Sequence, residues 1–255
     1  MQKEVVKKTA GFKVLAVILI ILLAAVTFTS CIRITGFSGS GNTKTQERNI
    51  SGIKSVSVSA GMNLYIEQAG SESLRIEADD NVIPKILTEV KDGHLEIKYK
   101  PWIFGFGGIN ITSPVNIYLT VADIDAIKAS SGANVQSSML NTDNLKITLS
   151  SGSSGKVEMQ VSKLIVDLSS GSNLKVSGIA DAQEADLSSG VNYDAYGLKS
   201  REAALDVSSG AVADINVSER LDVDISSGAT VRYIGTPQIV SNISSGGNLK
   251  NVSAD

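Results

Sequence analysis

Serine and aspartate recur at fixed positions in this sequence, and both side chains can do chemistry: serine as a nucleophile, stacked aspartates as ligands for a cation. The tripeptide Ser-Ser-Gly returns at glycines 20, 19, 19, 20, 18 and 18 residues apart. A nucleophilic serine needs a base, but the only histidine, His94, lies outside these repeats. The serines are therefore predicted to be structural. The repeating glycines are Gly132, Gly152, Gly171, Gly190, Gly210, Gly228 and Gly246.

Aspartate occupies the position four residues before four of these glycines. Carboxylates stacked about 5 Å apart repel each other unless something offsets their charge, and Ca²⁺ with its oxygen ligands would do so. The alternative is that each aspartate faces solvent and accepts hydrogen bonds from nearby donors. No loop of calcium-binding spacing accompanies the column, so we predict no cofactor and no dedicated metal centre, and keep the column as a candidate cation ladder. Its members are Asp167, Asp186, Asp206 and Asp224.

Aromatic residues gather in one glycine-containing segment, residues 101–108. Trp102, Phe104 and Phe106 include the only tryptophan of the chain and two of its five phenylalanines. An aromatic loop of this kind is a candidate binding surface for sugar rings or a protein partner. Its competing role is that of an apolar lid over the end of the fold. His94 follows an Asp-Gly pair, which predicts an exposed turn residue, and metal ligation would need partners that the sequence does not show.

The elements that position these residues follow from alternation around each glycine. Val166 and Leu168 precede Gly171 by five and three residues, and Leu174 and Val176 follow it by three and five. Apolar residues at every second position on both sides of a turn predict two short strands per repeat, each with one buried face. A period near 20 residues predicts a solenoid, in which successive coils stack as parallel strands about 4.8 Å apart.

Two further expectations concern the turns. Counting the alternation through the turn places the serine before each glycine inside, where stacked hydroxyls would bond from coil to coil. Asparagine recurs two residues after several of the glycines, and asparagine tolerates the left-handed conformation that a turn requires. The serines are Ser131, Ser151, Ser170, Ser189, Ser209, Ser227 and Ser245; the asparagines are Asn134, Asn173, Asn192 and Asn248.

The N-terminus carries an export pattern. Residues 1–13 hold four lysines and one glutamate, and residues 14–28 are uncharged and mainly apolar. The segment ends in Phe-Thr-Ser-Cys, which resembles a bacterial lipobox, and Cys31 is the only cysteine of the chain. We therefore predict a lipoprotein signal peptide over 1–30 and a lipid anchor on Cys31. The alternative is an uncleaved membrane helix over residues 14–32.

The rest of the chain divides into three predicted segments. A polar stretch, 31–49, is typical of a flexible tether. Residues 50–128 are predicted to form an N-terminal cap and irregular first coils, with Ser59-Ala60-Gly61 as a degenerate copy of the turn. Regular coils follow over 129–255. The last copy has Ser241 at an apolar position, so it is expected either to cap the solenoid or to pair with a second molecule.

Charge limits the choice of partners. The whole chain has 23 basic and 26 acidic residues, and without the four lysines and one glutamate of residues 1–30 it keeps 19 and 25, a net charge of −6. An acidic body disfavours nucleic acid and anionic membrane surfaces as partners.

The combination of features resembles one known family. A lipobox-like start, a Val-x-Val…Gly-x-Asn-Leu-x-Ile segment and Asp-x-Ser-Ser-Gly-x-x-x-x-Val coils together resemble the putative auto-transporter adhesin family with a head GIN domain, over residues 50–255. The resemblance implies a right-handed parallel β-helix and a place in the bacterial cell envelope. It supplies no catalytic or ligand-binding residues.

These observations predict a non-enzymatic envelope lipoprotein, with the outer membrane favoured, that presents a repetitive surface to a glycan or an envelope protein. One alternative is a periplasmic structural or scaffolding lipoprotein that self-associates through the end of the solenoid. Another is a polysaccharide-processing enzyme, since parallel β-helices host such chemistry; the repeats, however, offer no recurring pair of acid and base residues.

Overall fold

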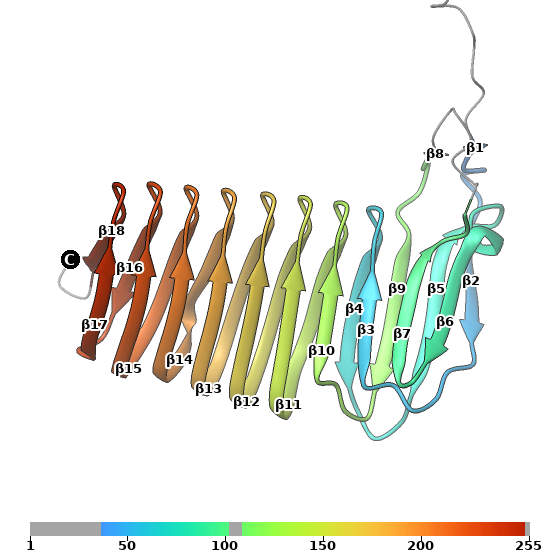
Figure 1. Cartoon of the computed structure of the whole chain (residues 1–255). Helices are drawn as coiled ribbons and strands as arrows, with labels where there is room; N and C mark the ends of the chain where they lie inside the picture. Colours follow the sequence, from blue (N-terminus) through green and yellow to red (C-terminus); the bar gives the residue numbers. More distant parts are fainter. Residues whose placement is uncertain (1–36, 102–108, 253–255) are drawn as a thin grey trace, which may run out of the picture.

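The computed structural model describes residues 37–101 and 109–252, and the described chain is mainly β-strand. Figure 1 shows the coils stacked in a row, with a tight turn along one edge and a broader bend along the other. Neighbouring coils pair in parallel, so the prediction of an all-β solenoid is confirmed. The N-terminal strands and the C-terminal coil lie at opposite ends of the row.

Five long strands build the regular part. Each runs from one Ser-Ser-Gly turn to the next and bends at its middle, so the two short strands predicted for each repeat are joined into one. Pairing continues around the bend, and in one pair the parallel register is unchanged on both sides of it, from Ser154–Asn173 through Lys163–Ala182 to Leu168–Leu187. The next pair along contains a shift of one residue, between Lys175 and Ser177. The strands are β11 (Asn134–Leu149), β12 (Ser154–Leu168), β13 (Asn173–Leu187), β14 (Asn192–Val207) and β15 (Val212–Ile225).

The ends of the solenoid differ from each other. At the C-terminal end, β16 (Thr230–Ile234) and β17 (Gln238–Ile243) both pair with β15, and β18 (Asn248–Asn251) pairs with β16. At the other end, β3 (Ser55–Val58), β4 (Asn63–Gln68), β9 (Asn116–Val121) and β10 (Ala126–Ala129) form parallel coils. β7 (His94–Tyr99) adds one more parallel strand beside β3, and beyond β7 and β9 the pairing becomes antiparallel.

The antiparallel strands close the N-terminal end. On one face β6 (Ile86–Lys91) pairs with β7 (His94–Tyr99), and on the other β5 (Ser73–Asp79) lies between β9 and β2 (Thr43–Arg48). A short parallel pair, β1 (Phe37–Ser38) with β8 (Ile109–Asn110), and a 3₁₀ turn at Ile83–Lys85 complete the described elements. The flexible tether predicted for 31–49 is wrong over residues 43–48, because these polar residues form β2.

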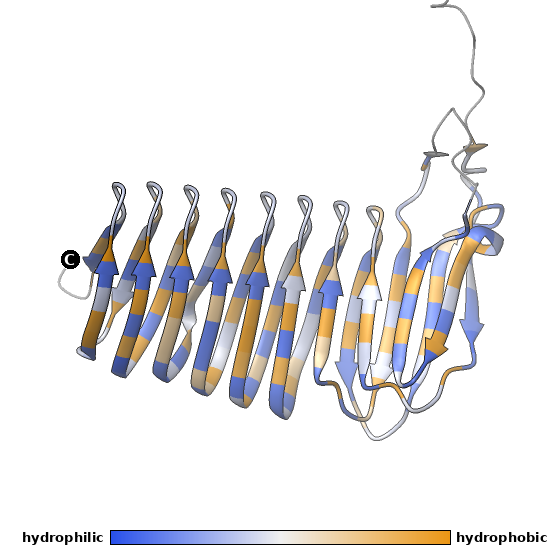
Figure 2. Cartoon of the chain, in the orientation of Figure 1, coloured by the Kyte–Doolittle hydropathy of each residue, from blue (hydrophilic) through white to orange (hydrophobic). Residues whose placement is uncertain are grey.

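The core is a set of apolar columns between the two faces, and Figure 2 shows the apolar and polar bands that alternate along each strand. The column three residues before each turn glycine is at most 3% exposed in every coil from Val58 to Ile225. Burial of each such side chain stabilises the fold by about 1.5–3 kcal/mol. The column contains Val58, Ala129, Leu149, Leu168, Leu187, Val207 and Ile225.

The turn serines do not point inward, which corrects the predicted hydroxyl ladder. The second serine of each turn is exposed and has a positive φ, as in Ser170 (53°), followed by Gly171 (68°). Two successive positive φ values are typical of a type I′ turn. Alternation cannot be counted through such a turn. The asparagines named above are absent from the positive-φ residues, so their predicted left-handed role is also wrong.

Backbone groups and different serines connect the turns. From Gly132 to Gly228, the N–H of each turn glycine donates to the carbonyl of the second serine in the next coil, as from Gly171 to Ser189 at 3.0 Å. The buried hydroxyls belong to the residue after the glycine: Ser172 Oγ donates to the Leu149 carbonyl at 3.1 Å, and Ser153 Oγ to that of Ala129 at 3.0 Å. A coil-to-coil ladder exists, but it is mainly a ladder of peptide groups.

Candidate functional site

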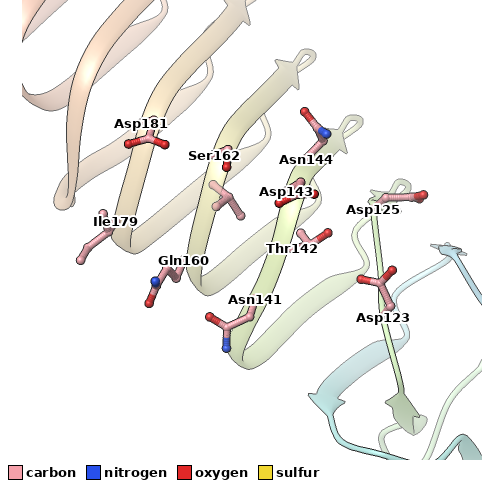
Figure 3. A pocket seen from close by; sticks show the side chains of 11 residues that line it. Asp123, Asp125, Asn141, Thr142, Asp143, Asn144, Gln160, Ser162, Ile179 and Asp181 are labelled. Carbon is pink, nitrogen blue, oxygen red and sulfur yellow. The ribbon is translucent and has the colours of Figure 1, made fainter.

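A groove of about 720 Å³ lies along the bend edge of the solenoid, where three successive coils and the β9–β10 connection meet (Figure 3). The bends of β11, β12 and β13 supply residues 141–144, 160–162 and 179–181, and the connection supplies Asp123 and Asp125. The groove is lined by four carboxylates, three amides and two hydroxyls, with Val161 and Ile179 as its apolar side chains. The polar residues are Asp123, Asp125, Asn141, Thr142, Asp143, Asn144, Gln160, Ser162 and Asp181.

Hydrogen bonds fix one wall of this groove. The side chain of Gln68, at the end of β4, accepts from the Asn141 N–H at 2.6 Å and donates to the Asn141 carbonyl at 3.0 Å. The same amide donates to the Ala122 carbonyl at 3.2 Å. Gln68 therefore ties the bend of β11 to the β9–β10 connection and sets the distance between these two sides of the groove.

The carboxylates of the groove differ in whether a basic side chain lies within ion-pair distance. Lys54 donates to Asp123 at 2.9 Å, and this hydrogen bond lowers the pKa of Asp123 and raises that of Lys54. Asp181 lies 4.0 Å from Arg201. Within the described ranges, Asp125 and Asp143 have no basic side chain within ion-pair distance. The groove thus keeps an excess of negative charge next to amide donors.

The aspartate column exists as a register column on the face before the turns. Asp167, Asp186, Asp206 and Asp224 are partners in successive coils, with Thr148 before them and Asn242 after them. Asp167 is paired with Lys146 at 2.6 Å. The other three carboxylates make no side-chain hydrogen bond or ion pair with any residue that the structure describes.

The column borders a shallow groove of about 490 Å³ to which Glu184 and Asp222 also contribute. These two acids are paired with Lys163 at 2.7 Å and Arg220 at 3.3 Å. Over residues 37–101 and 109–252, no group of three histidine, cysteine or acidic side chains is close enough to hold a metal ion. Cation binding by the column stays a prediction from the sequence.

His94 is not an exposed turn residue, contrary to the prediction. It begins β7 and is half-buried beside β3, where Ser55 Oγ lies 2.9 Å from Nδ1 and Ser57 Oγ lies 2.9 Å from Nε2. The parallel register of β3 and β7 places His94 directly opposite Ser55. Both ring nitrogens are thus satisfied by hydroxyl groups in a structural cluster.

Several predicted residues lie outside the described ranges: Cys31 in the N-terminal segment and Trp102, Phe104 and Phe106 in the aromatic loop. The lipid anchor and the aromatic binding surface therefore remain predictions. In the part of the chain that the structure covers, no helix has the length and hydropathy to cross a membrane. The bend groove was not predicted, although the polar run Asn141-Thr142-Asp143-Asn144, midway between two turns, is a signal for it.

Stacked parallel coils, a backbone ladder at the turns and polar grooves on the outside define a β-solenoid that offers surfaces for binding. The chain belongs to the family described as putative auto-transporter adhesin, head GIN domain, whose model matches residues 37–237. The resemblance inferred from the turn sequences is confirmed.

Solved structures share this fold. A putative adhesin from Bacteroides fragilis is 20% identical with a TM-score of 0.79 and covers 85% of this chain and 100% of its own. A putative lipid binding protein from Parabacteroides distasonis is 20% identical with a TM-score of 0.71, covering 86% and 100%. A putative adhesin from Parabacteroides merdae is 19% identical with a TM-score of 0.69, covering 85% and 99%. No curated protein matches the sequence.

Proposed function

We propose that this protein is a non-enzymatic adhesin of the cell envelope that binds a neutral, hydroxyl-rich polymer, such as a glycan, in the bend groove. The observation that carries the proposal is the groove itself, an opening of about 720 Å³ lined by carboxylate, amide and hydroxyl groups. The family match and the neighbouring putative adhesins support a binding role over a catalytic one.

The chemistry of the lining selects the class of ligand. Carboxylates accept hydrogen bonds from sugar hydroxyls, amides both donate and accept, and hydrogen bonds to charged groups contribute about 1.5–3 kcal/mol each. Asp125 and Asp143 have no ion-pair partner in the described structure, so the groove keeps negative charge and a uronic or sulfated polymer would be repelled. A groove that crosses three coils also suits a chain of sugar units better than a single one.

The experiment is binding of the full-length protein, in mild detergent, to immobilised neutral glucans and mannans and to uronic-acid polymers. Asp125→Ala and Asp143→Ala are expected to weaken binding to the neutral polymer about tenfold each, since each removes a charged hydrogen-bond acceptor. Asp206→Ala, an exposed aspartate outside the groove, is the matched control and is expected to bind normally. Equal losses in all three variants, or preference for the uronic polymers, would contradict the proposal.

We also propose that a lipid on Cys31 anchors the protein in the cell envelope. The lysine-rich start, the apolar run and the single cysteine support it. Mass spectrometry of the N-terminal peptide from the membrane fraction is expected to find a chain that begins at a lipidated Cys31. A chain that still contains residues 1–30 would favour the uncleaved helix.

A further inference from the structure

The two ends of the solenoid treat their outermost strands differently. At the N-terminal end, β2 carries Lys44, Glu47 and Arg48, and β6 carries Glu89 and Lys91. Charged side chains on edge strands are a common protection against pairing with other chains. β6 also keeps Ile86 fully buried, and its one exposed apolar residue, Val90 at 41%, lies between Glu89 and Lys91.

At the C-terminal end the two edge strands differ: β18 carries Lys250, whereas β17 lacks both protections. β17 has the sequence Gln-Ile-Val-Ser-Asn-Ile, without a charge, and each of its residues is exposed. Among the described residues it pairs with β15 alone, so its outer edge has no neighbouring strand. This coil lies beyond residue 237, where the family match ends.

The exposed isoleucines of β17 continue two columns of the apolar core that are buried in the coil before it. Ile239 continues the column of Leu221, and Ile243 that of Ile225, both of which are at most 1% exposed one coil earlier. Ile239 is 41% exposed and Ile243 45% exposed because no coil among the described residues lies over them. Val240, on the outer face, is 53% exposed.

We propose that two copies of the chain associate through their C-terminal coils, with β17 of each copy pairing antiparallel to β17 of the other across a two-fold axis. A two-fold axis perpendicular both to the row of coils and to the face that holds β17 reverses the strand direction, so like strands meet antiparallel. The uncharged edge of β17 can face itself without repulsion, whereas the N-terminal edge strands β2 and β6 carry charged side chains.

The core fixes the register of this pairing. Directly opposite residues of an antiparallel pair lie on the same face, so inward residues must meet inward residues. Centring the pair on Ser241 places Ile239 opposite Ile243 of the second copy on the core side. On the outer side it places Val240 opposite Asn242 of the second copy. A shift by one residue would turn both isoleucines toward polar positions.

Cross-linking tests the two-fold axis. The full chain with Cys31→Ser has no thiol, and adding Ser241→Cys creates one at the axis, where two copies are expected to form a disulfide-linked dimer on mild oxidation. Ser138→Cys, at an exposed serine of β11 outside the bend groove, is the matched control and is expected to stay monomeric. Equal yields from the two variants, or absence of the Ser241 dimer, would overturn the proposal.

Charge variants test the register. Val240→Asp with Asn242→Asp places like charges opposite each other twice, and is expected to raise the dimer Kd about tenfold in sedimentation experiments. Val240→Lys with Asn242→Asp changes the same positions but sets opposite charges together, and is expected to keep the dimer. Both positions are exposed, so the monomer should tolerate either pair. Equal Kd values for the two variants would overturn the register. The glycan assay is a separate readout, so either proposal can fail alone.

Discussion

Tyr193 places a hydroxyl in the middle of an apolar core, and a chain of hydrogen bonds satisfies it. The hydroxyl donates to Gln183 Oε1 at 2.9 Å, Gln183 Nε2 donates to Ser200 Oγ at 2.7 Å, and Ser200 Oγ donates to the Asn216 carbonyl at 2.8 Å. Burial raises the pKa of Tyr193, so the phenol stays protonated as a donor. The three side chains act as one unit across neighbouring coils.

Tyr193→Phe is expected to lower the free energy of unfolding by about 1–3 kcal/mol, because Gln183 Oε1 is left buried without its donor. Combining Tyr193→Phe with Gln183→Leu and Ser200→Ala is expected to recover most of the loss, since no side chain of the group is then unsatisfied. Tyr233→Phe is the control, with an expected change within about 0.5 kcal/mol. Urea unfolding measures each value, and a Tyr193→Phe protein as stable as this control would argue against the network.

At the scale of the element, each bent strand relies on close contact with the strand before it. Gly178, in the first half of β13, has a φ of 118°, and a Cβ added there would lie 1.8 Å from the Met159 carbonyl oxygen of β12. At the turn glycine Gly171, an added Cβ would have no atom within 4 Å. The two glycines are therefore required for different reasons, one for space and one only for its backbone conformation.

Gly178→Ala is expected to destabilise the protein by at least about 3 kcal/mol, because a strained φ and a clash with backbone add together. Gly171→Ala is expected to cost about 1–2 kcal/mol, the strain of one left-handed residue. Thermal unfolding of the two variants compares them directly. Similar midpoints would mean that the coils can separate locally at Gly178 without loss of pairing.

At the scale of the whole molecule, the aspartate column places like charges next to each other in successive coils, and their repulsion lowers the stability of the solenoid. Asp206 lies between Asp186 and Asp224 and shares their lack of a described partner. Asp206→Asn is expected to raise stability by about 0.2–1 kcal/mol for each relieved pair at low salt, with a smaller gain at high salt. Unfolding with and without Ca²⁺ measures the effect. A loss of stability confined to the calcium sample would instead indicate a cation ladder.

The repeat period and the strand alternation were enough to predict the stacked coils and the aspartate column, because both depend on spacing alone. The inward serines failed because side chains do not alternate through a turn with two positive φ values. The strand at 43–48 was missed because it is polar on both faces, as an exposed edge allows. The His94 cluster and the bend groove depend on which distant strands become neighbours, which spacing within one repeat does not specify.

Each repeat of the sequence adds one coil to the stack, so the number of repeats sets the length of the solenoid. Duplication of one repeat, such as residues 172–190, would add a coil whose columns align with those on either side, and would lengthen the rod by about 4.8 Å. Loss of a repeat would shorten it by the same step. Gain or loss of a repeat of 18–20 residues can therefore change the length of the rod by one coil at a time, while both ends stay unchanged.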